Sequence, residues 1–238
     1  MEASFLWIAA ILFLSAFTQG LSGFGVALVS MALLPKLIGI QASIALVALI
    51  AFVVDLSVLL RYWRSLQFKT MLPLILASFV GVPLGIFLLR RLDEAVTLPI
   101  LGVIIAGYAL YALLGLELPK LQGRGWAYGT GFLGGLLGGA YNTPGPPIIV
   151  YASCQQWEPD TFKGNLQTFF IQNSIIVLLG HYLSGNLTPE IWSMFWRGLP
   201  WLLGGIVTGL SMDRWLNPET FRKIVLVLLV VTGLRLVF

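Results

Sequence analysis

Six uninterrupted apolar runs of about 20 residues dominate this chain, at about 42–60, 71–89, 95–115, 162–182, 190–211 and 220–238. A transmembrane helix needs about 20 largely apolar residues, so each run is long enough to cross a bilayer. With 58% hydrophobic and 10% charged residues, the 238-residue chain has too little polar surface for a water-facing globule. The sequence therefore predicts an all-α polytopic (multi-pass) membrane protein.

Two further apolar stretches, about 4–35 and 125–154, are interrupted by glycine and proline. The first interruption lies at 19–25 and the second, longer one at 134–147. Glycine costs about 1 kcal/mol and proline about 3 kcal/mol in a helix interior, so we expect each stretch to be two half-helices joined by unwound backbone. Such backbone persists at membrane depth only where protein buries it or where it lines a wet cavity.

The two halves of the chain resemble each other. Glycines of the first half coincide with glycines of the second after a fixed offset: Gly81 with Gly205 and Gly85 with Gly209 at 124, and Gly20 with Gly135 and Gly23 with Gly138 at 115. We therefore divide the single membrane domain into a first repeat, 1–117, and a second repeat, 118–238. The second repeat carries about nine extra residues, some of which we assign to its proline-rich interruption.

The charges predict how the repeats are oriented. If each broken stretch is a re-entrant hairpin, each half has three full spans and the second half is inverted. Nine of the 14 Lys and Arg residues then lie in the loops on one side, at 61–69, 116–124, 154–163 and 212–223. The positive-inside tendency favours this arrangement over two full crossings, which split the basic residues evenly. The basic excess thus indicates a lipid bilayer as its partner and no nucleic acid. Inverted repeats with broken helices are typical of secondary transporters.

The interruptions predict an anion site. A half-helix that begins in mid-membrane presents unpaired N–H groups and a partial positive charge, which attract an anion without a buried cation. The substrate-binding candidates at the two interruptions are Gln19, Ser22, Gly23, Phe24, Gly25, Asn142, Thr143 and Gly145. The alternative is that glycines only permit close helix packing. We prefer that alternative for Gly81, Gly85, Gly205 and Gly209.

The run at 162–182 is unusually polar for a membrane span. Asn165, Thr168 and Gln172 follow helical spacing, so they share a face that we expect to point into the bundle. We add Lys163, Asn165 and Gln172 to the substrate-binding candidates. Interhelical hydrogen bonding is an equally weighted alternative for the polar face, and snorkelling toward the headgroups is the default expectation for Lys163.

The remaining titratable residues predict no catalytic group. We expect Asp55 to pair with Arg61 or to face water rather than to relay protons. His181 is the only histidine and Cys154 the only cysteine, which excludes an intrachain disulfide. A lone histidine forms neither a metal site nor a Ser–His–Asp triad, so we predict no metal, no cofactor and no enzyme activity.

Together these motifs resemble the sulfite exporter TauE/SafE family of membrane transporters. The resemblance lies in segments 20–25, 134–139 and 145–151, and in Phe162-Lys163 at the start of the polar helix, where the family frequently has Phe-Arg. It implies a proton-coupled secondary transporter of the cell inner (plasma) membrane that exports small sulfur-containing anions, such as sulfite or organosulfonates. A passive anion channel and, less favoured, an intramembrane enzyme are the alternatives. Whether copies form a homo-oligomer is left open.

Overall fold

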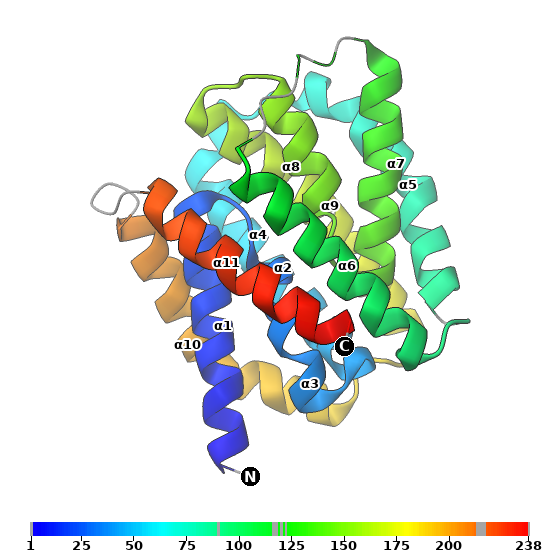
Figure 1. Ribbon diagram of the computed structural model, residues 1–238, viewed down its shortest axis with the longest axis vertical. Helices are drawn as coiled ribbons and strands as arrows, with labels where there is room; N and C mark the ends of the chain where they lie inside the picture. The colour runs from blue at the N-terminus through cyan, green and yellow to red at the C-terminus, as the bar shows by residue number, and fades with distance from the viewer. Residues whose placement is uncertain are drawn as a thin grey trace.

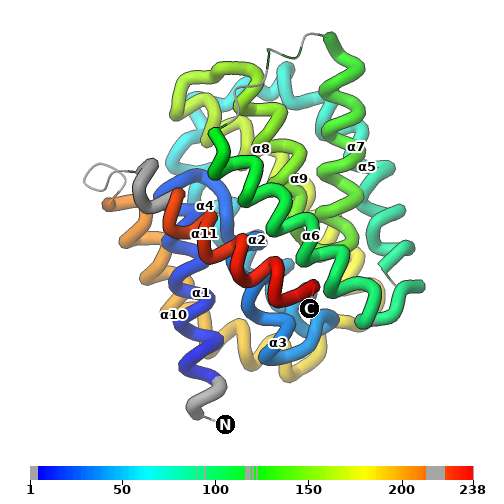
Figure 2. The backbone as a smooth tube through the Cα atoms, viewed as in Figure 1, coloured from blue at the N-terminus to red at the C-terminus, as the bar shows by residue number. Residues whose placement is uncertain are grey.

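The computed structural model describes residues 2–89, 91–115, 119, 121, 123–212 and 218–237, and all secondary structure among them is helical. In chain order the elements are α1 (Glu2–Ser22), α2 (Val26–Leu33), α3 (Pro35–Ile38), α4 (Ile40–Tyr62), a 3-10 turn (Trp63–Ser65), α5 (Phe68–Leu89), α6 (Glu94–Leu113), α7 (Arg124–Tyr141), α8 (Gly145–Cys154), α9 (Pro159–Leu183), α10 (Pro189–Met212) and α11 (Pro218–Val237). Figures 1 and 2 show them packed as one helical bundle. The predicted boundary between 117 and 118 lies outside the described residues.

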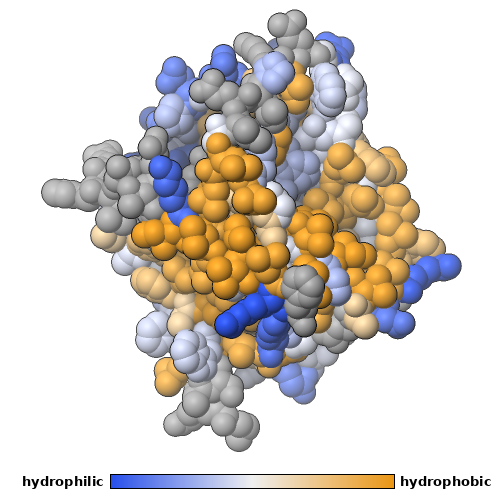
Figure 3. All heavy atoms as spheres, viewed as in Figure 1, coloured by the Kyte–Doolittle hydropathy of each residue, from blue (hydrophilic) through white to orange (hydrophobic). Residues whose placement is uncertain are grey.

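Within the described ranges, five helices are long and apolar enough to cross a membrane: Phe5–Ser22, Ile40–Ser65, Phe68–Leu89, Ala95–Leu113 and Pro159–Leu183. Four of them confirm predicted runs, and the fifth is α1. α10 and α11 form helices over the last two predicted runs, but their crossing of the membrane stays a prediction. Figure 3 shows a broad apolar band across one face, with hydrophilic residues mostly above and below it.

Both broken stretches are helix pairs joined by three non-helical residues, at 23–25 and 142–144, as predicted. The prediction of two half-helices is wrong for the first pair, because α1 has 21 residues and α2 only 8. At 1.5 Å per residue α1 is about 31 Å long, close to the thickness of the hydrocarbon core. The break therefore follows a nearly full-length helix rather than dividing the stretch evenly.

Each broken pair folds back on itself, with α2 packed against α1 and α8 against α7. In Figure 1, α1 rises from the N-terminus at the bottom, and α2 and α3 return toward that end. α7 descends from the top, and α8 returns upward (Figures 1 and 2). The two breaks therefore lie inside the bundle, each reached from a different end.

The helix contacts have a two-fold pattern. α5 packs along α7 as α10 packs along α1, while α4 pairs with α9 and α6 with α11. Exchanging α1, α2, α4, α5 and α6 with α7, α8, α9, α10 and α11 turns the α5–α7 pair into the α10–α1 pair and leaves the α4–α9 and α6–α11 pairs unchanged. The pattern supports the predicted repeat, whose inverted orientation stays a prediction.

The structure also corrects the predicted register of the breaks. Ser22 and Tyr141 end α1 and α7, and Val26 and Gly145 begin α2 and α8, so each pair lies 119 residues apart. The expected offset of 115 is therefore about one helical turn short. Because both breaks have the same length, the extra residues of the second half lie after α8 and not in the proline-rich break.

Glycines let the paired helices approach closely, as predicted. A Cβ on Gly81 or Gly85 of α5 would lie 2.3 or 2.2 Å from a backbone carbonyl oxygen of α7. On α10, a Cβ at Gly205 or Gly209 would lie 2.4 or 2.5 Å from a carbonyl oxygen of α1. On the opposite side of these contacts, Gly20 of α1 lies against α10, and Gly135 and Gly139 of α7 lie against α5. These members of the glycine clusters therefore also serve helix packing.

Candidate substrate site

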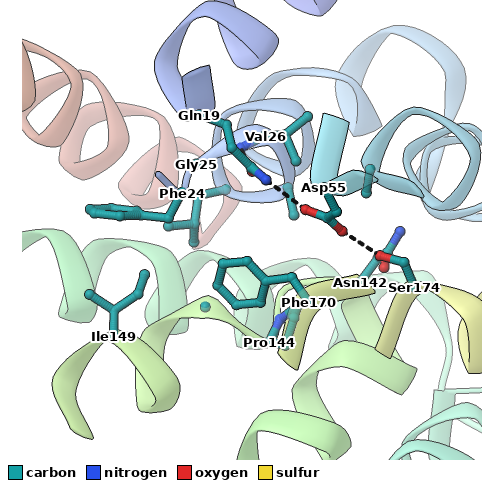
Figure 4. A pocket seen from close by; sticks show the side chains of 14 residues that line it. Gln19, Phe24, Gly25, Val26, Asp55, Asn142, Pro144, Ile149, Phe170 and Ser174 are labelled. Atoms are coloured by element: carbon teal, nitrogen blue, oxygen red, sulfur yellow. Dashed lines mark hydrogen bonds between the residues drawn. The ribbon is translucent and has the colours of Figure 1, made fainter. Parts of the chain in front are cut away.

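A small cavity lined by buried residues lies where the two breaks meet. Its walls come from both breaks and from the middle of α4 and α9, and consist of Gln19, Phe24, Gly25, Val26, Ala27, Leu28, Ala51, Asp55, Asn142, Pro144, Gly145, Ile149, Phe170 and Ser174. Figure 4 shows the ring of Phe170 between the first break and Pro144. The cavity measures about 20 Å³, which is room for about one water molecule.

A buried carboxyl group lies in this wall. Asp55 on α4 is 2% exposed, and the Gln19 side-chain amide of α1 donates to its Oδ1 at 2.6 Å. The Ser174 hydroxyl of α9 donates to its Oδ2, also at 2.6 Å (Figure 4). Our expectation that Asp55 pairs with Arg61 or faces water is therefore wrong, because Arg61 is exposed on another face of α4. The structure instead joins three helices through this carboxyl.

Gln19 links the carboxyl to the first break. Its Oε1 accepts the backbone N–H of Val26, the first residue of α2, at 3.0 Å. Its Nε2 also donates to Oε1 of Gln167 at 3.2 Å, and Nε2 of Gln167 donates to the carbonyl of Gly23 at 2.6 Å. The N-cap residue of α2 is Gly25, which has no side chain to accept a first-turn N–H. Gln19 therefore supplies the capping acceptor from the last turns of α1.

Polar groups of the first break form hydrogen bonds within the break and to the last turns of α1. The Ser22 hydroxyl oxygen lies 2.7 Å from the carbonyl oxygens of both Thr18 and Phe24, so its single hydrogen can be donated to either of them. Gly23 and Gly25 have φ angles of 83° and 123°, a region that favours glycine. Ser22 and Gly23 were predicted as ligand contacts, but they do not line the cavity, whereas Phe24 and Gly25 do.

The second break leaves buried polar atoms without partners. Asn142 adopts the left-handed conformation, and its N–H donates to the carbonyl of Gly138 at 2.8 Å, which ends α7. Within the described structure, neither Asn142 Nδ2 nor Thr143 Oγ1 makes a hydrogen bond. Leaving a buried polar group unpaired costs about 1–3 kcal/mol. Of these two residues, only Asn142 lies in the cavity wall.

Lys163 does not snorkel, contrary to expectation. It is 9% exposed, and its Nζ donates to the carbonyl of Leu21 at 3.1 Å and to the Tyr62 hydroxyl at 3.3 Å. The ammonium also lies 5.1 Å from the centre of the Tyr62 ring. A cation at the C-terminal end of a helix is stabilised by the helix dipole. Lys163 therefore compensates the end of α1 at the break, outside the cavity wall.

Replacing Lys163 with methionine is expected to lower the free energy of unfolding by about 2 kcal/mol, because the Leu21 carbonyl and the Tyr62 hydroxyl lose a charged donor. Thermal unfolding in detergent measures the loss, with the exposed Lys69→Met as the matched control. Equal melting temperatures for the two variants would contradict this role. If Lys163→Met still binds the anion with the affinity of the wild type, Lys163 stabilises the fold and does not contact the substrate.

The polar face of α9 is turned toward helix packing. Asn165 Oδ1 accepts the backbone N–H of Gln67 at 2.7 Å, and Gln172 Oε1 accepts the Ser78 hydroxyl at 2.9 Å. The Thr168 hydroxyl donates to its own helix at Gly164. These contacts match the alternative of hydrogen bonding between segments, and none of the three side chains lines the cavity.

The cavity face of α9 consists of other residues, which our sequence analysis missed. Phe170 and Ser174 lie in the wall, and Gln167, one turn before Phe170, bonds to Gln19. Asp55 and Ser174 are 119 residues apart, which is the true offset of the breaks. Aligning the two halves with an offset of 119 would therefore have placed Asp55 and Ser174 at equivalent positions.

Five of the eleven predicted substrate residues line the cavity: Gln19, Phe24, Gly25, Asn142 and Gly145. The other six, Ser22, Gly23, Thr143, Lys163, Asn165 and Gln172, lie outside its wall. Substrate contact by any of them stays a prediction. Elsewhere, His181 Nδ1 lies 3.1 Å from the amide of Asn186, and Cys154 is a buried free thiol. No group of three His, Cys, Asp or Glu residues gathers anywhere in the described ranges.

A multi-pass helical bundle in which two interrupted helices meet at a buried cavity is the arrangement typical of membrane transporters. The family described as Sulfite exporter TauE/SafE matches residues 8–236, and the chain therefore belongs to this family of membrane anion exporters. The resemblance inferred from its glycine motifs is confirmed. Comparison with curated proteins and with solved structures gives no match.

Proposed function

We propose that this protein is a proton-coupled secondary transporter that exports small sulfur-containing anions, such as sulfite or organosulfonates, across the cell inner membrane. Membership of the sulfite exporter family supports the class of cargo. The small volume of the cavity supports a compact substrate rather than a bulky one. Together they favour a carrier with a single central site.

The observation that carries this proposal is the convergence of two helix N-termini on one cavity. α2 begins at Val26 and α8 at Gly145, and both residues lie in the wall. Each N-terminus contributes a partial positive charge, which favours an anion. Gln19 already accepts the Val26 N–H, and Pro146 and Pro147 have no N–H, so the backbone donors are those of α2 after Val26 and that of Gly145. The unpaired Nδ2 of Asn142 adds a further donor at the same wall. These neutral donors bind an oxyanion without a basic side chain in the wall.

Transport requires the walls to move. An anion such as sulfite is larger than a water molecule, and the cavity has room for about one water. We propose that the two halves are inverted repeats and that one rocks against the other around the breaks, which alternately opens the site to each side. The two-fold pattern of helix contacts supports this mechanism.

Gly145→Val tests the site. A Cβ at Gly145 meets only the end of the Ile149 side chain at 3.2 Å and that of Leu28 at 3.9 Å, so the variant should fold with its cavity filled. An anion at 100 times its Kd stabilises the wild-type protein by about 2.7 kcal/mol. We expect sulfite or a sulfonate to raise the melting temperature of the wild type and not that of Gly145→Val.

The control is Gly107→Val on α6, where a Cβ meets nothing within 4 Å among the described residues. It should keep both the thermal shift and saturable uptake into liposomes. A wild-type protein that neither binds nor takes up sulfite or sulfonates would contradict the proposed function. Flux that does not saturate and ignores a proton gradient would instead identify a passive anion channel.

A further inference from the structure

We propose that Asp55 carries the coupled proton on Oδ2, and that the anion occupies the cavity only together with this proton. The inference rests on the proposed function and adds to it a residue, an atom and a direction of coupling. It begins from the position of the carboxyl group, which lies in the wall of the cavity that the anion would fill (Figure 4).

No other charged side chain lines the cavity within the described part of the chain. Asp55 meets Gln19 from α1 and Ser174 from α9, and α2 has no titratable residue. Of the described titratable groups on the elements packed against α4, Lys163 lies at Leu21 and Tyr62, His181 at Asn186, Glu190 at Thr188, Arg197 at the Phe5 ring and Lys36 at the Arg235 carbonyl. Arg64 lies over the Trp63 ring, and Asp160 and Tyr182 are exposed. The carboxyl group thus has two neutral hydrogen-bond donors and no cation beside it.

The hydrogen-bond network determines which oxygen can hold a proton. The Val26 backbone N–H can only donate, so the amide oxygen of Gln19 faces Val26 and the Gln19 N–H₂ group faces Oδ1 of Asp55. The Gln19 N–H₂ group beside Oδ1 can only donate, so it cannot accept a hydrogen carried by Oδ1. Ser174, 2.6 Å from Oδ2, has a hydroxyl that can either donate or accept. Protonation therefore places the hydrogen on Oδ2, and the Ser174 hydroxyl turns to accept it.

Electrostatics then couples the proton to the anion. An ionised Asp55, which is 2% exposed, and an anion in the same small cavity would be like charges close together and largely shielded from bulk water, which disfavours their joint presence. Neutralising Asp55 removes this repulsion and leaves the two helix N-termini as the dominant field. Because the coupling is reciprocal, a bound anion favours protonation of Asp55 to the same extent.

The coupling determines the direction in which the proton moves. Water on the side where the anion binds supplies the proton to Oδ2, and the proton returns to water on the side where the anion leaves. The carboxyl group is restored at the end of each cycle, and no covalent bond to the anion forms. Proton and anion therefore cross in the same direction.

Proton uptake on anion binding tests this inference directly. Purified protein in weakly buffered detergent solution is titrated with methanesulfonate, whose single charge does not change between pH 5 and 8, and a pH indicator follows the bulk solution. We expect the wild type to take up about one proton per anion where Asp55 is ionised, and to bind methanesulfonate at least about tenfold more weakly at pH 8 than at pH 6.

Asp55→Asn should bind methanesulfonate with an affinity independent of pH and take up no proton, because the amide imitates the protonated acid. Asp160→Asn makes the same chemical change at an exposed site on α9 and should behave as the wild type. Wild-type binding without proton uptake would overturn the inference and leave the proposed function standing, and this measurement needs no variant to fold. Unchanged pH dependence in Asp55→Asn would also overturn it. Absence of methanesulfonate, sulfite and sulfonate binding at every pH would instead contradict the proposed function itself.

Discussion

Gly85→Ala is expected to lower the free energy of unfolding by about 3 kcal/mol, the upper part of the range for overpacked interiors. The new Cβ would lie 2.2 Å from the carbonyl oxygen of Leu136 and 2.8 Å from the amide nitrogen of Ala140. Both atoms belong to the backbone of α7, so no side-chain rotation relieves the contact. α5 and α7 must separate along the most extensive helix pair of the bundle. Thermal unfolding in detergent measures the loss.

Gly107→Ala on α6 is the matched control. A Cβ there meets nothing within 4 Å in the described structure, and alanine is the better helix former by about 0.5–1 kcal/mol. The control should therefore unfold at the same temperature as the wild type or slightly above it. Similar melting temperatures for Gly85→Ala and Gly107→Ala would contradict the close contact of α5 with α7.

Gln19→Leu is expected to reduce anion uptake into liposomes to below about a tenth of the wild-type rate. The substitution removes the acceptor for the Val26 N–H, the donor to Asp55 Oδ1 and the donor to Gln167 Oε1. Each buried polar group left unpaired costs about 1–3 kcal/mol, so the first break loses its geometry and the protein loses stability as well. Uptake is measured at equal amounts of reconstituted protein.

Gln155→Leu is the control for this variant. Gln155 directly follows α8 and donates a hydrogen bond to the Leu121 carbonyl at 2.9 Å, but it lies outside the cavity wall. Its uptake should stay within about twofold of the wild type, because a single hydrogen bond contributes about 1 kcal/mol to stability and none to this site. If Gln155→Leu lost as much uptake as Gln19→Leu, the network around Asp55 would have no special role in transport.

Local patterns in the sequence predict the helices and the breaks well. The apolar runs become α4, α5, α6 and α9, and the glycine and proline clusters become interruptions at 23–25 and 142–144. These features depend on backbone preferences and side-chain hydrophobicity, which act within one helix. The packing role of Gly81 and Gly209 also follows from spacing alone, because small residues at this interval permit close helix approach.

The composition of the cavity wall depends on contacts between distant segments. On α9, sequence reasoning selected the face of Asn165, Thr168 and Gln172, whereas the cavity takes Phe170 and Ser174. The two faces are similarly polar, so composition did not distinguish them. Which face points inward depends on how α9 packs between α4 and α5, which no local pattern encodes.

Asp55 and Lys163 were misplaced for the same reason. Judged by position along a span, a carboxyl six residues from Arg61 suggested an ion pair, and a lysine near a helix start suggested snorkelling. In the bundle, the end of α1 lies beside α4 and α9. There the Leu21 carbonyl accepts a hydrogen bond from Lys163, and the Gln19 side chain donates one to Asp55. Neither partner lies nearby in the sequence.

By itself, the sequence determined that this chain is a multi-pass helical membrane protein of the sulfite exporter family with two interrupted helices, because hydrophobicity and backbone preference act over a few neighbouring residues. Only the tertiary structure decided that Gln19, Asp55 and Ser174 meet at one buried cavity. These residues come from α1, α4 and α9, and their hydrogen bonds form only after those helices have packed together.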